Sequence, residues 1–279
     1  MKPETLEGGA ISYAPCRYGS SKIFFRGPRR SLERPYLTFV GGSQTYGKFI
    51  AKPFANLVEE REGTACINLG CLNASVDAFL QEPAVGDICR QSRLNVLQVM
   101  SAHNMSNRFY TVHPRRNDRF VGESSVLRAL YPEVDFSEFC FVRHLLSTLY
   151  TLSPERFEVL VVELRSAWRA RMQHFIHCIG SHTYLLWFAE HLPTNANWND
   201  RAEPLRSEPL FVTRQMVDEL RPMVRGVVVV QPSQRAKAQG TRGMVFLGTD
   251  TAAATELLNP AAHDEAAQAL SLAIRANLA

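Results

Sequence analysis

Hydrophobic positions along the chain alternate between short runs typical of strands and longer runs with helical spacing. The short runs are rich in β-branched and aromatic residues and are bounded by Gly or polar residues, which predicts strands. Strands are expected at residues 36–40, 65–69, 94–99, 183–188 and 226–230. Because helical stretches separate most of them, the pattern predicts a three-layer α/β/α fold with a mostly parallel sheet of about five strands.

The longest predicted helix covers residues 154–179. Ser153 is a suitable cap, Pro154 fits the first turn, and apolar residues then recur at helical spacing until Gly180. Two further helices are expected at residues 49–60, ended by Gly63, and at residues 260–278, capped by Asn259.

Two insertions interrupt this alternation. Residues 101–150 follow the third strand and are rich in Arg and aromatic residues, and residues 191–212 are rich in Pro and Asn. Insertions at the carboxyl ends of parallel strands tend to shape the binding crevice of such sheets. No internal repeat is visible, so a single domain is expected over residues 1–279.

Composition argues against several classes of protein, namely nucleic-acid-binding, secreted and membrane proteins. The chain has 279 residues, 46% of them hydrophobic, and a net charge of +4, which is too small to indicate nucleic-acid binding by itself. The first ten residues lack a basic segment followed by an apolar one, and the apolar run at 226–230 is too short to cross a bilayer. Six single cysteines without a CxxC pair indicate reduced thiols. We therefore expect a cytoplasmic protein that binds neither membranes nor nucleic acid and needs no cofactor or metal.

A glycine pair follows the first predicted strand and precedes a serine. The stretch reads Phe39-Val40-Gly41-Gly42-Ser43-Gln44-Thr45-Tyr46-Gly47-Lys48. Two glycines after a strand allow a tight turn that exposes Ser43 at the crevice. A serine there is a nucleophile when a base reaches it, and its backbone N–H can help to hold an oxyanion. A plainer interpretation, in which the serine only caps the next helix, stays open.

Three segments are similar to sequence blocks of the SGNH (GDSL-type) hydrolases. The first is Gly41-Gly42-Ser43, where that superfamily reads Gly-Gly-Ser or Gly-Asp-Ser. The second is Ile67-Asn68-Leu69-Gly70-Cys71-Leu72-Asn73-Ala74, which resembles a strand ending in an Asn-x-Gly turn. Asn73 replaces a glycine that donates an oxyanion-hole N–H, and Asn tolerates the left-handed backbone angles needed there. The third, Ala102-His103-Asn104-Met105, implies Asn104 as a side-chain donor.

The fourth element of the resemblance is an Asp-x-x-His pair at the start of the last helix. His263 has the matching position and is implied as the general base for Ser43. The aspartate is replaced by Pro260, next to the helix cap Asn259, and Asp250 is a distant candidate to orient the imidazole. The triad is therefore reduced to a Ser–His dyad, and loss of the acid costs about 10⁴-fold in rate in the serine proteases.

The resemblance implies an SGNH/flavodoxin-like fold and a serine esterase or O-acyl (acetyl) transferase acting on a polar substrate such as a carbohydrate. The missing carboxylate favours an alternative, a catalytically degenerate relative that binds an anionic glycan or a protein partner. Whether the protein is an enzyme stays open at this point, and the oligomeric state is not set by the sequence. The chain also resembles a bacterial family known only as a domain of unknown function.

A second alternative uses the same stretch as a phosphate-binding loop. Residues Gly42–Lys48 fit Gly-x4-Gly-Lys after a strand, which indicates a nucleotide-dependent transferase. The pattern then requires Ser or Thr to bind Mg²⁺, whereas this chain has Phe49. No hydrophobic strand ends in an aspartate that would complete the metal site.

The 101–150 insertion carries the candidate substrate-binding residues. Guanidinium groups suit phosphate, sulfate or carboxylate because they offer paired donors in a fixed fork, and an aromatic ring can stack on a sugar. The candidates are Arg108, Arg115, Arg116 and Tyr110. The plainer interpretation is a solvated loop held by ion pairs to Asp118, Glu123 and Asp135. His103 and His144 are alternative bases, although structural roles are more common for such residues, and the spacing of His174, His177 and Cys178 matches no common zinc site.

Overall fold

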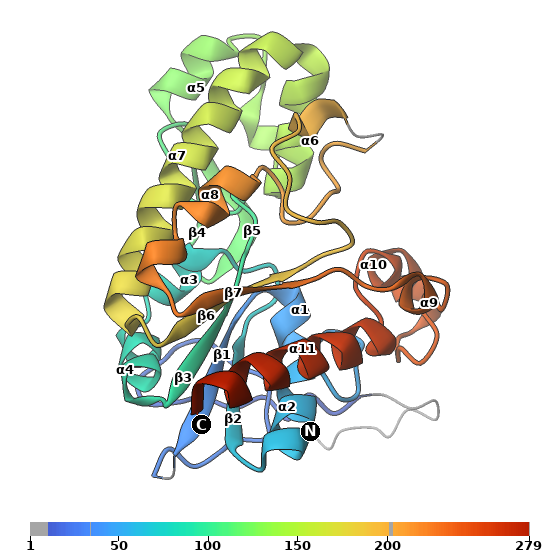
Figure 1. Ribbon diagram of the computed structural model, residues 1–279. Coiled ribbons are helices and arrows are strands. Elements are labelled where there is room, and N and C mark those ends of the chain that lie inside the picture. The colour runs from blue at the N-terminus through green and yellow to red at the C-terminus, as the bar shows by residue number, and fades with distance from the viewer. Residues whose placement is uncertain (1–10, 34, 201–202, 279) are drawn as a thin grey trace, which may run out of the picture.

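The computed structural model describes residues 11–33, 35–200 and 203–278, and a five-stranded sheet forms its centre (Figure 1). The strands are β1 (Tyr36–Gly41), β2 (Ala65–Gly70), β3 (Leu94–Gln98), β6 (Thr183–Phe188) and β7 (Gly226–Val230). All pairs are parallel, in the order β2-β1-β3-β6-β7. The predicted α/β class and five strands are confirmed, and the order is that of flavodoxin-like sheets. Residues 1–10, on which the expectation about a secretory signal rests, lie outside the described residues.

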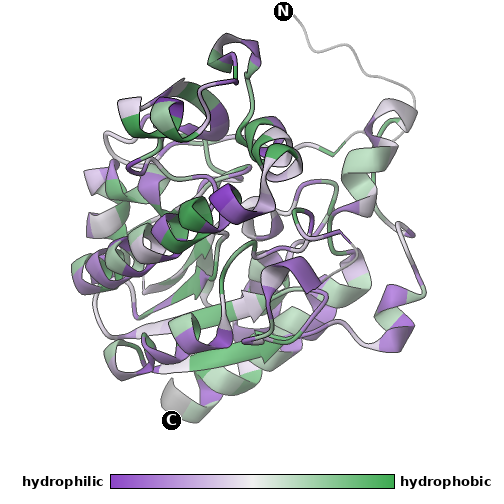
Figure 2. Cartoon of the chain, turned by 90° about the horizontal axis from the view of Figure 1, so that it is seen from above, coloured by the Kyte–Doolittle hydropathy of each residue, from purple (hydrophilic) through white to green (hydrophobic). Residues whose placement is uncertain are grey.

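Helices cover both faces of the sheet, as the strand pattern predicts. On one face α2 (Phe54–Glu62) and α11 (Pro260–Leu278) pack on the strands through apolar side chains such as Leu37, Phe39 and Leu270. On the other face lie α3 (Val76–Leu80), α4 (Pro83–Gln91) and α7 (Pro154–Ile179). Figure 2 shows mostly hydrophobic strands surrounded by helices that carry both hydrophobic and hydrophilic residues. The sheet is therefore buried on both faces, which matches its continuous apolar strands.

The predicted helix boundaries hold where a capping residue defines them. Ser153 accepts a hydrogen bond from the Arg156 N–H at 3.2 Å, and α7 ends at Gly180, whose φ is 95°. The helix expected at 49–60 instead begins at Phe54. Gly47 and Phe49 have left-handed φ values of 71° and 66°, which turns the chain away from a helical path before α2.

The first insertion contains elements that the sequence did not predict. It forms an antiparallel hairpin of β4 (Tyr110–His113) and β5 (Arg116–Glu123), followed by α5 (Ser125–Leu130), a 3₁₀ turn at Phe136–Glu138 and α6 (Val142–Leu152). The second insertion returns to the end of β3, where the Ala102 N–H donates to the Leu210 carbonyl at 3.0 Å. The remaining short helices are α1 (Ser43–Tyr46), α8 (Arg214–Asp218), α9 (Gln234–Lys237) and α10 (Thr251–Thr255), with 3₁₀ turns at Trp198–Asp200, Arg221–Met223 and Gly248–Asp250.

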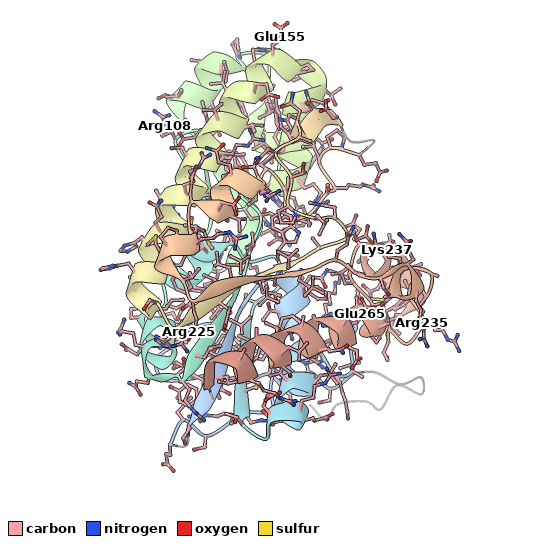
Figure 3. The ribbon with its side chains drawn as sticks, viewed as in Figure 1. Arg108, Glu155, Arg225, Arg235, Lys237 and Glu265 are labelled. Atoms are coloured by element: carbon pink, nitrogen blue, oxygen red, sulfur yellow. The ribbon has the colours of Figure 1, made fainter. Side chains whose placement is uncertain are left out.

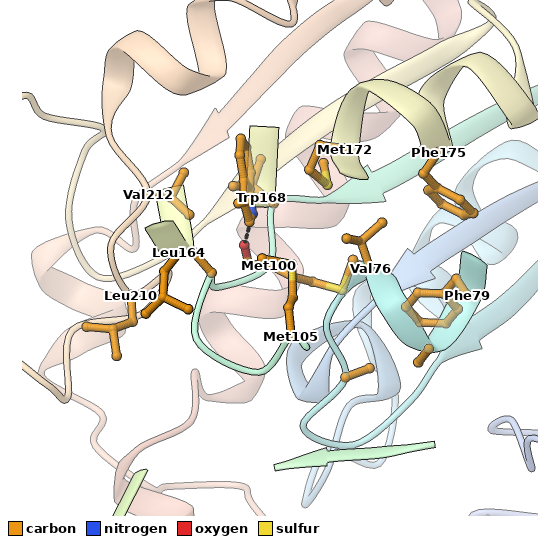
Figure 4. Close-up of a cluster of buried hydrophobic side chains, with 14 of the residues drawn as sticks. Val76, Phe79, Met100, Met105, Leu164, Trp168, Met172, Phe175, Leu210 and Val212 are labelled. Carbon is orange, nitrogen blue, oxygen red and sulfur yellow. Dashed lines mark hydrogen bonds between the residues drawn. The ribbon is translucent and has the colours of Figure 1, made fainter. Parts of the chain in front are cut away.

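Buried packing fixes the loop that follows β3. Trp168 of α7 is fully buried, and its indole Nε1–H donates to the Met100 carbonyl at 2.8 Å (Figure 4). Met105, a few residues further along, is also fully buried in this apolar cluster. Because both ends of the 100–105 loop are held, the residues between them have defined positions at the carboxyl edge of the sheet.

Two further observations concern the chain as a whole. Within the described ranges, no helix combines the length and apolar character that a bilayer span would need. All six cysteines carry free thiols.

Candidate functional site

The turn that carries Ser43 is held by the side chain of Gln98, the last residue of β3. Gln98 Oε1 accepts hydrogen bonds from the Gly42 N–H at 3.1 Å, the Thr45 N–H at 3.1 Å and the Thr45 hydroxyl at 2.6 Å. A Cβ atom at Gly41 would lie 2.2 Å from Thr45 Oγ1 and 2.6 Å from Gln98, so only glycine fits there. Ser43 therefore lies at a fixed point between the carboxyl ends of β1 and β3.

That point is the topological switch of the sheet. The chain leaves β1 toward β2 on one side and β3 lies on the other, so the two connections diverge and leave a crevice at the carboxyl edge. Asn68 of β2 ties the same turn from the other side. Its Nδ2 donates to the Thr45 carbonyl at 2.8 Å and its Oδ1 accepts from the Gly70 N–H at 2.8 Å. The first and second sequence blocks thus meet here.

Asn73 is the direct partner of the serine. Its φ is 53°, which confirms the left-handed backbone expected of this residue. Its N–H donates to Ser43 Oγ at 3.0 Å, and the Ser43 hydroxyl donates to Asn73 Oδ1 at 3.1 Å. Asn104 lies next to this pair, because its Nδ2 donates to the Asn73 carbonyl at 3.2 Å. The structure therefore brings together Ser43, Asn73 and Asn104, the three residues expected in an oxyanion hole.

Asp118 of the β4–β5 hairpin completes the cluster. Asn73 Nδ2 donates to Asp118 Oδ2 at 3.1 Å, and this contact leaves Asn73 Oδ1 directed at the serine. The neighbouring Asn117 is fully buried and accepts from the Ser75 N–H at 2.8 Å and the Ser75 hydroxyl at 3.0 Å, which attaches the hairpin to the start of α3. Sequence reasoning missed Asp118 as a site residue, because its approach depends on how the hairpin folds back.

The proposed base, His263, does not belong to this cluster. Its side chain is 0% exposed, stacks on Phe54 with ring centroids 5.6 Å apart and meets the Phe188 ring edge-on at 5.2 Å. Its Nδ1 accepts from the Phe54 N–H at 3.2 Å, and its Nε2 has no hydrogen-bond partner in the described part of the chain. Burial lowers the pKa of His263 to about 3, so the ring is neutral at pH 7.

The prediction of a Ser43–His263 dyad is therefore wrong. The position of His263 in the last helix matches the resemblance, but this part of α11 turns its buried side toward the sheet, together with Ala262 and Ala266. Asn259 is the helix cap, as expected, since its Oδ1 accepts from the Ala262 N–H at 3.0 Å.

Other histidines do not replace the missing base. His103 is buried beside Asn104, its Nδ1 has no hydrogen-bond partner within the described residues, and burial lowers its pKa to about 3. His144 is exposed and packs against the Phe139 ring, with centroids 4.9 Å apart. No histidine of the described chain forms a hydrogen bond with Ser43 in the structure.

The candidate substrate-binding residues divide into two groups. Arg108 pairs with Glu163 of α7, with Nη2 and Oε2 2.7 Å apart, so its charge is already neutralised. Tyr110 is only 1% exposed and its hydroxyl donates to the His103 carbonyl at 2.6 Å, because the first residue of β4 points inward. The prediction that Tyr110 stacks on a substrate is therefore wrong. Arg115 and Arg116 lie exposed at the hairpin tip, and neither forms an ion pair with another described residue.

The nucleotide-loop interpretation does not fit the backbone. A phosphate-binding loop opens a helix at its Lys, whereas here α1 lies inside the motif and ends at Tyr46, with Gly47 as its C-cap. Lys48 follows outside that helix, and its Nζ lies 4.5 Å from the centroid of the Phe49 ring. The prediction that residues Gly42–Lys48 form a nucleotide-binding loop is therefore wrong.

Potential metal ligands do not converge within the described ranges. There, no group of three or more His, Cys, Asp or Glu side chains is placed to hold a metal ion. Cys178 Sγ lies 3.8 Å from His174 Nε2, as a pair of surface side chains on α7.

Comparisons with known proteins locate the chain in a family. The solved structures similar to it include two with a TM-score of 0.43 each. One is a carbohydrate esterase family 2 enzyme with a carbohydrate-binding domain from Corynascus thermopiles (Myceliophthora fergusii), 12% identical, covering 91% of this chain and 69% of that one. The other is a lipase/acylhydrolase from Enterococcus faecalis, 10% identical, covering 87% of this chain and 96% of that one. No curated protein matches. Residues 1–278 match a family described as "Domain of unknown function (DUF6473)", and the chain belongs to that family.

Proposed function

We propose that this protein binds a polar, anionic ligand such as an acidic glycan at the Ser43 turn, in an SGNH-like site that lacks histidine-driven turnover. The observation that carries the proposal is the partner of the serine. Ser43 Oγ contacts the amide of Asn73, which is held in turn by Asp118, whereas His263 is sealed in apolar packing.

The contacts around Ser43 suit binding better than proton abstraction. Asp118 Oδ2 accepts a hydrogen bond from Asn73 Nδ2, so the amide oxygen of Asn73 faces the serine and accepts a hydrogen bond from its hydroxyl. An amide oxygen accepts a hydrogen bond but is not a base at neutral pH. A serine hydroxyl becomes a nucleophile only when an adjacent base takes its proton. In the structure the Ser43 hydroxyl and the Asn73 N–H donate to each other's residue, and an oxygen-rich ligand would bind by taking over these two donors.

The hairpin tip supplies positive charge beside these donors. Asn117 attaches the hairpin to the loop that contains Asn73, so the exposed Arg115 and Arg116 are tethered near the serine. A guanidinium without an ion-pair partner is free to bind a carboxylate or sulfate through paired N–H donors. This arrangement favours an anionic ligand over a neutral one.

Calorimetry with trigalacturonic acid tests the proposal. We expect saturable binding that weakens between 50 and 300 mM NaCl, survives Ser43→Ala with a change of less than about tenfold, and drops at least about fivefold in the double variant Arg115→Gln/Arg116→Gln. The matched control Arg235→Gln/Arg242→Gln removes the same charge from exposed residues near α9 and should bind like the wild type. Equal losses in the two double variants would show that only net charge matters and would contradict the proposed site.

A serine esterase or O-acyltransferase is the second candidate, and one observation favours it. The left-handed Asn73 directs its N–H at Ser43 Oγ from 3.0 Å with Asn104 adjacent, so the residues proposed as oxyanion-hole donors lie at the serine. This candidate requires a base to reach Ser43 once substrate is bound. Hydrolysis of p-nitrophenyl acetate discriminates the two functions. Turnover by the wild type that disappears in Ser43→Ala would establish the esterase and overturn a purely binding function. Equal background rates for the two proteins would exclude the esterase.

A further inference from the structure

A pocket of about 380 Å³ lies at the carboxyl ends of β6 and β7, outside the Ser43 cluster. Its volume is within the range of about 300–1,000 Å³ typical of small-molecule sites. The loops after the two strands, α10 and the start of α11 surround it. Its lining includes Glu190, Pro232, Lys237, Leu257, Leu258 and Ala262.

The floor of this pocket is apolar. Leu258 and Ala262 are buried there, and Leu257 and Pro232 add further apolar surface. Asn259 has no free polar group to offer, because its Nδ2 donates to the carbonyls of Ala236 and Gly240 and its Oδ1 caps α11. An apolar chain is therefore the ligand portion that this floor accommodates best.

One cation lines the pocket wall. Lys237 Nζ donates to the Glu190 carbonyl at 2.8 Å and forms no ion pair with any described residue. An ammonium group has three donors, so two remain after this contact. Glu190 is exposed and contributes its carbonyl oxygen to Lys237 and Gln231. Lys237 is thus positioned by the backbone while its charge is left without a counterion.

We propose that this pocket binds a small amphiphilic carboxylate, with the carboxylate on Lys237 and a short apolar chain against Leu258 and Ala262. A carboxylate supplies the missing counterion, and burial of the chain contributes about 25 cal/mol per Å² of apolar surface. The site does not depend on the function proposed for Ser43. It is nevertheless connected to that turn, since the Leu258 N–H donates to Gln44 Oε1 at 3.4 Å.

Octanoate, with octan-1-ol as the neutral probe of equal chain length, tests this site by calorimetry or ligand-observed NMR. We expect saturable octanoate binding to the wild type and to Ser43→Ala alike. Lys237→Gln should weaken octanoate at least about fivefold and leave octan-1-ol within about twofold. Arg235→Gln is the matched control, because it removes a charge from the same helix at a side chain that points away from the protein (Figure 3).

Blocking variants locate the bound chain. Thr241→Trp fills the pocket from a half-exposed position and should abolish binding of both probes, and Ala262→Trp should do the same from the floor if the variant folds. No saturable octanoate binding up to 5 mM, equal losses in Lys237→Gln and Arg235→Gln, or unchanged binding in Thr241→Trp would each overturn the proposal. Because Ser43→Ala keeps the pocket, a failure at Ser43 and a failure here are distinguishable.

Discussion

Gln98→Leu is expected to destabilise the protein through the turn that carries Ser43. Gln98 is buried, and its Oε1 is the acceptor for the Gly42 N–H, the Thr45 N–H and the Thr45 hydroxyl. The Thr45 N–H lies in the first turn of α1, where no intrahelical acceptor exists. Leucine has a similar volume but offers no acceptor, so both backbone donors lose their partner.

The expected loss follows from the cost of unsatisfied buried groups. Each buried backbone N–H left without an acceptor costs about 1–3 kcal/mol, so the two together cost about 2–6 kcal/mol. The added apolar burial of leucine offsets about 1 kcal/mol. A net decrease of about 1–5 kcal/mol in the free energy of unfolding is therefore expected.

Urea unfolding at pH 7.5, followed by far-UV circular dichroism, measures this loss. With a slope of about 2–3 kcal/mol/M, the midpoint should fall by about 0.3–2.5 M. Gln98→Glu is the control, because a carboxylate accepts from the same three donors and should lose less than half as much as Gln98→Leu. A loss below about 1 kcal/mol for the leucine variant, or equal losses for both variants, would refute the role assigned to this side chain.

Three further substitutions test other parts of the structure. Burial lowers the pKa of His263 to about 3, against 6.5 for the ordinary side chain. Between these two pH values the unfolded chain binds a proton at His263 and the folded chain does not, so protein stability falls as the pH drops from about 6.5 toward 3. At pH 5 this loss is about 2 kcal/mol, and His263→Gln should remove it. The difference between the urea midpoints at pH 7.5 and pH 5 should therefore be smaller in the variant than in the wild type, and an undiminished difference would contradict the buried, neutral state of His263. Asn73→Gly should change the thermal midpoint little, whereas Asn73→Val should lower stability by about 1–3 kcal/mol, because a β-branched residue is strained at a φ of 53°; identical midpoints would argue against the left-handed backbone. Asn117→Ala should cost about 2–4 kcal/mol in urea unfolding by leaving the Ser75 N–H without its acceptor, and a neutral effect would show that the hairpin is not attached there.

The sequence by itself determined the secondary structure wherever a local signal was strong. The strands at 183–188 and 226–230 have the predicted bounds, because each is a short run rich in β-branched or aromatic residues. The first is fully buried inside the parallel sheet, and the second forms its edge. Ser153 and Gly180 defined α7 because capping depends only on nearby backbone groups. The hairpin at 110–123 escaped prediction, since charged and aromatic residues in it give no regular alternation.

In the candidate site, too, local sequence signals predicted some residue positions and tertiary packing decided the others. Glycines after β1 and an asparagine tolerant of left-handed angles were enough to predict that Ser43 and Asn73 face one crevice, because the carboxyl ends of parallel strands share an edge. Only the tertiary structure decided that Asp118 approaches Asn73 and that His263 packs between Phe54 and Phe188. A spacing along the chain fixes where a residue lies on its helix, but the face that the helix buries is set by packing against side chains far away in sequence.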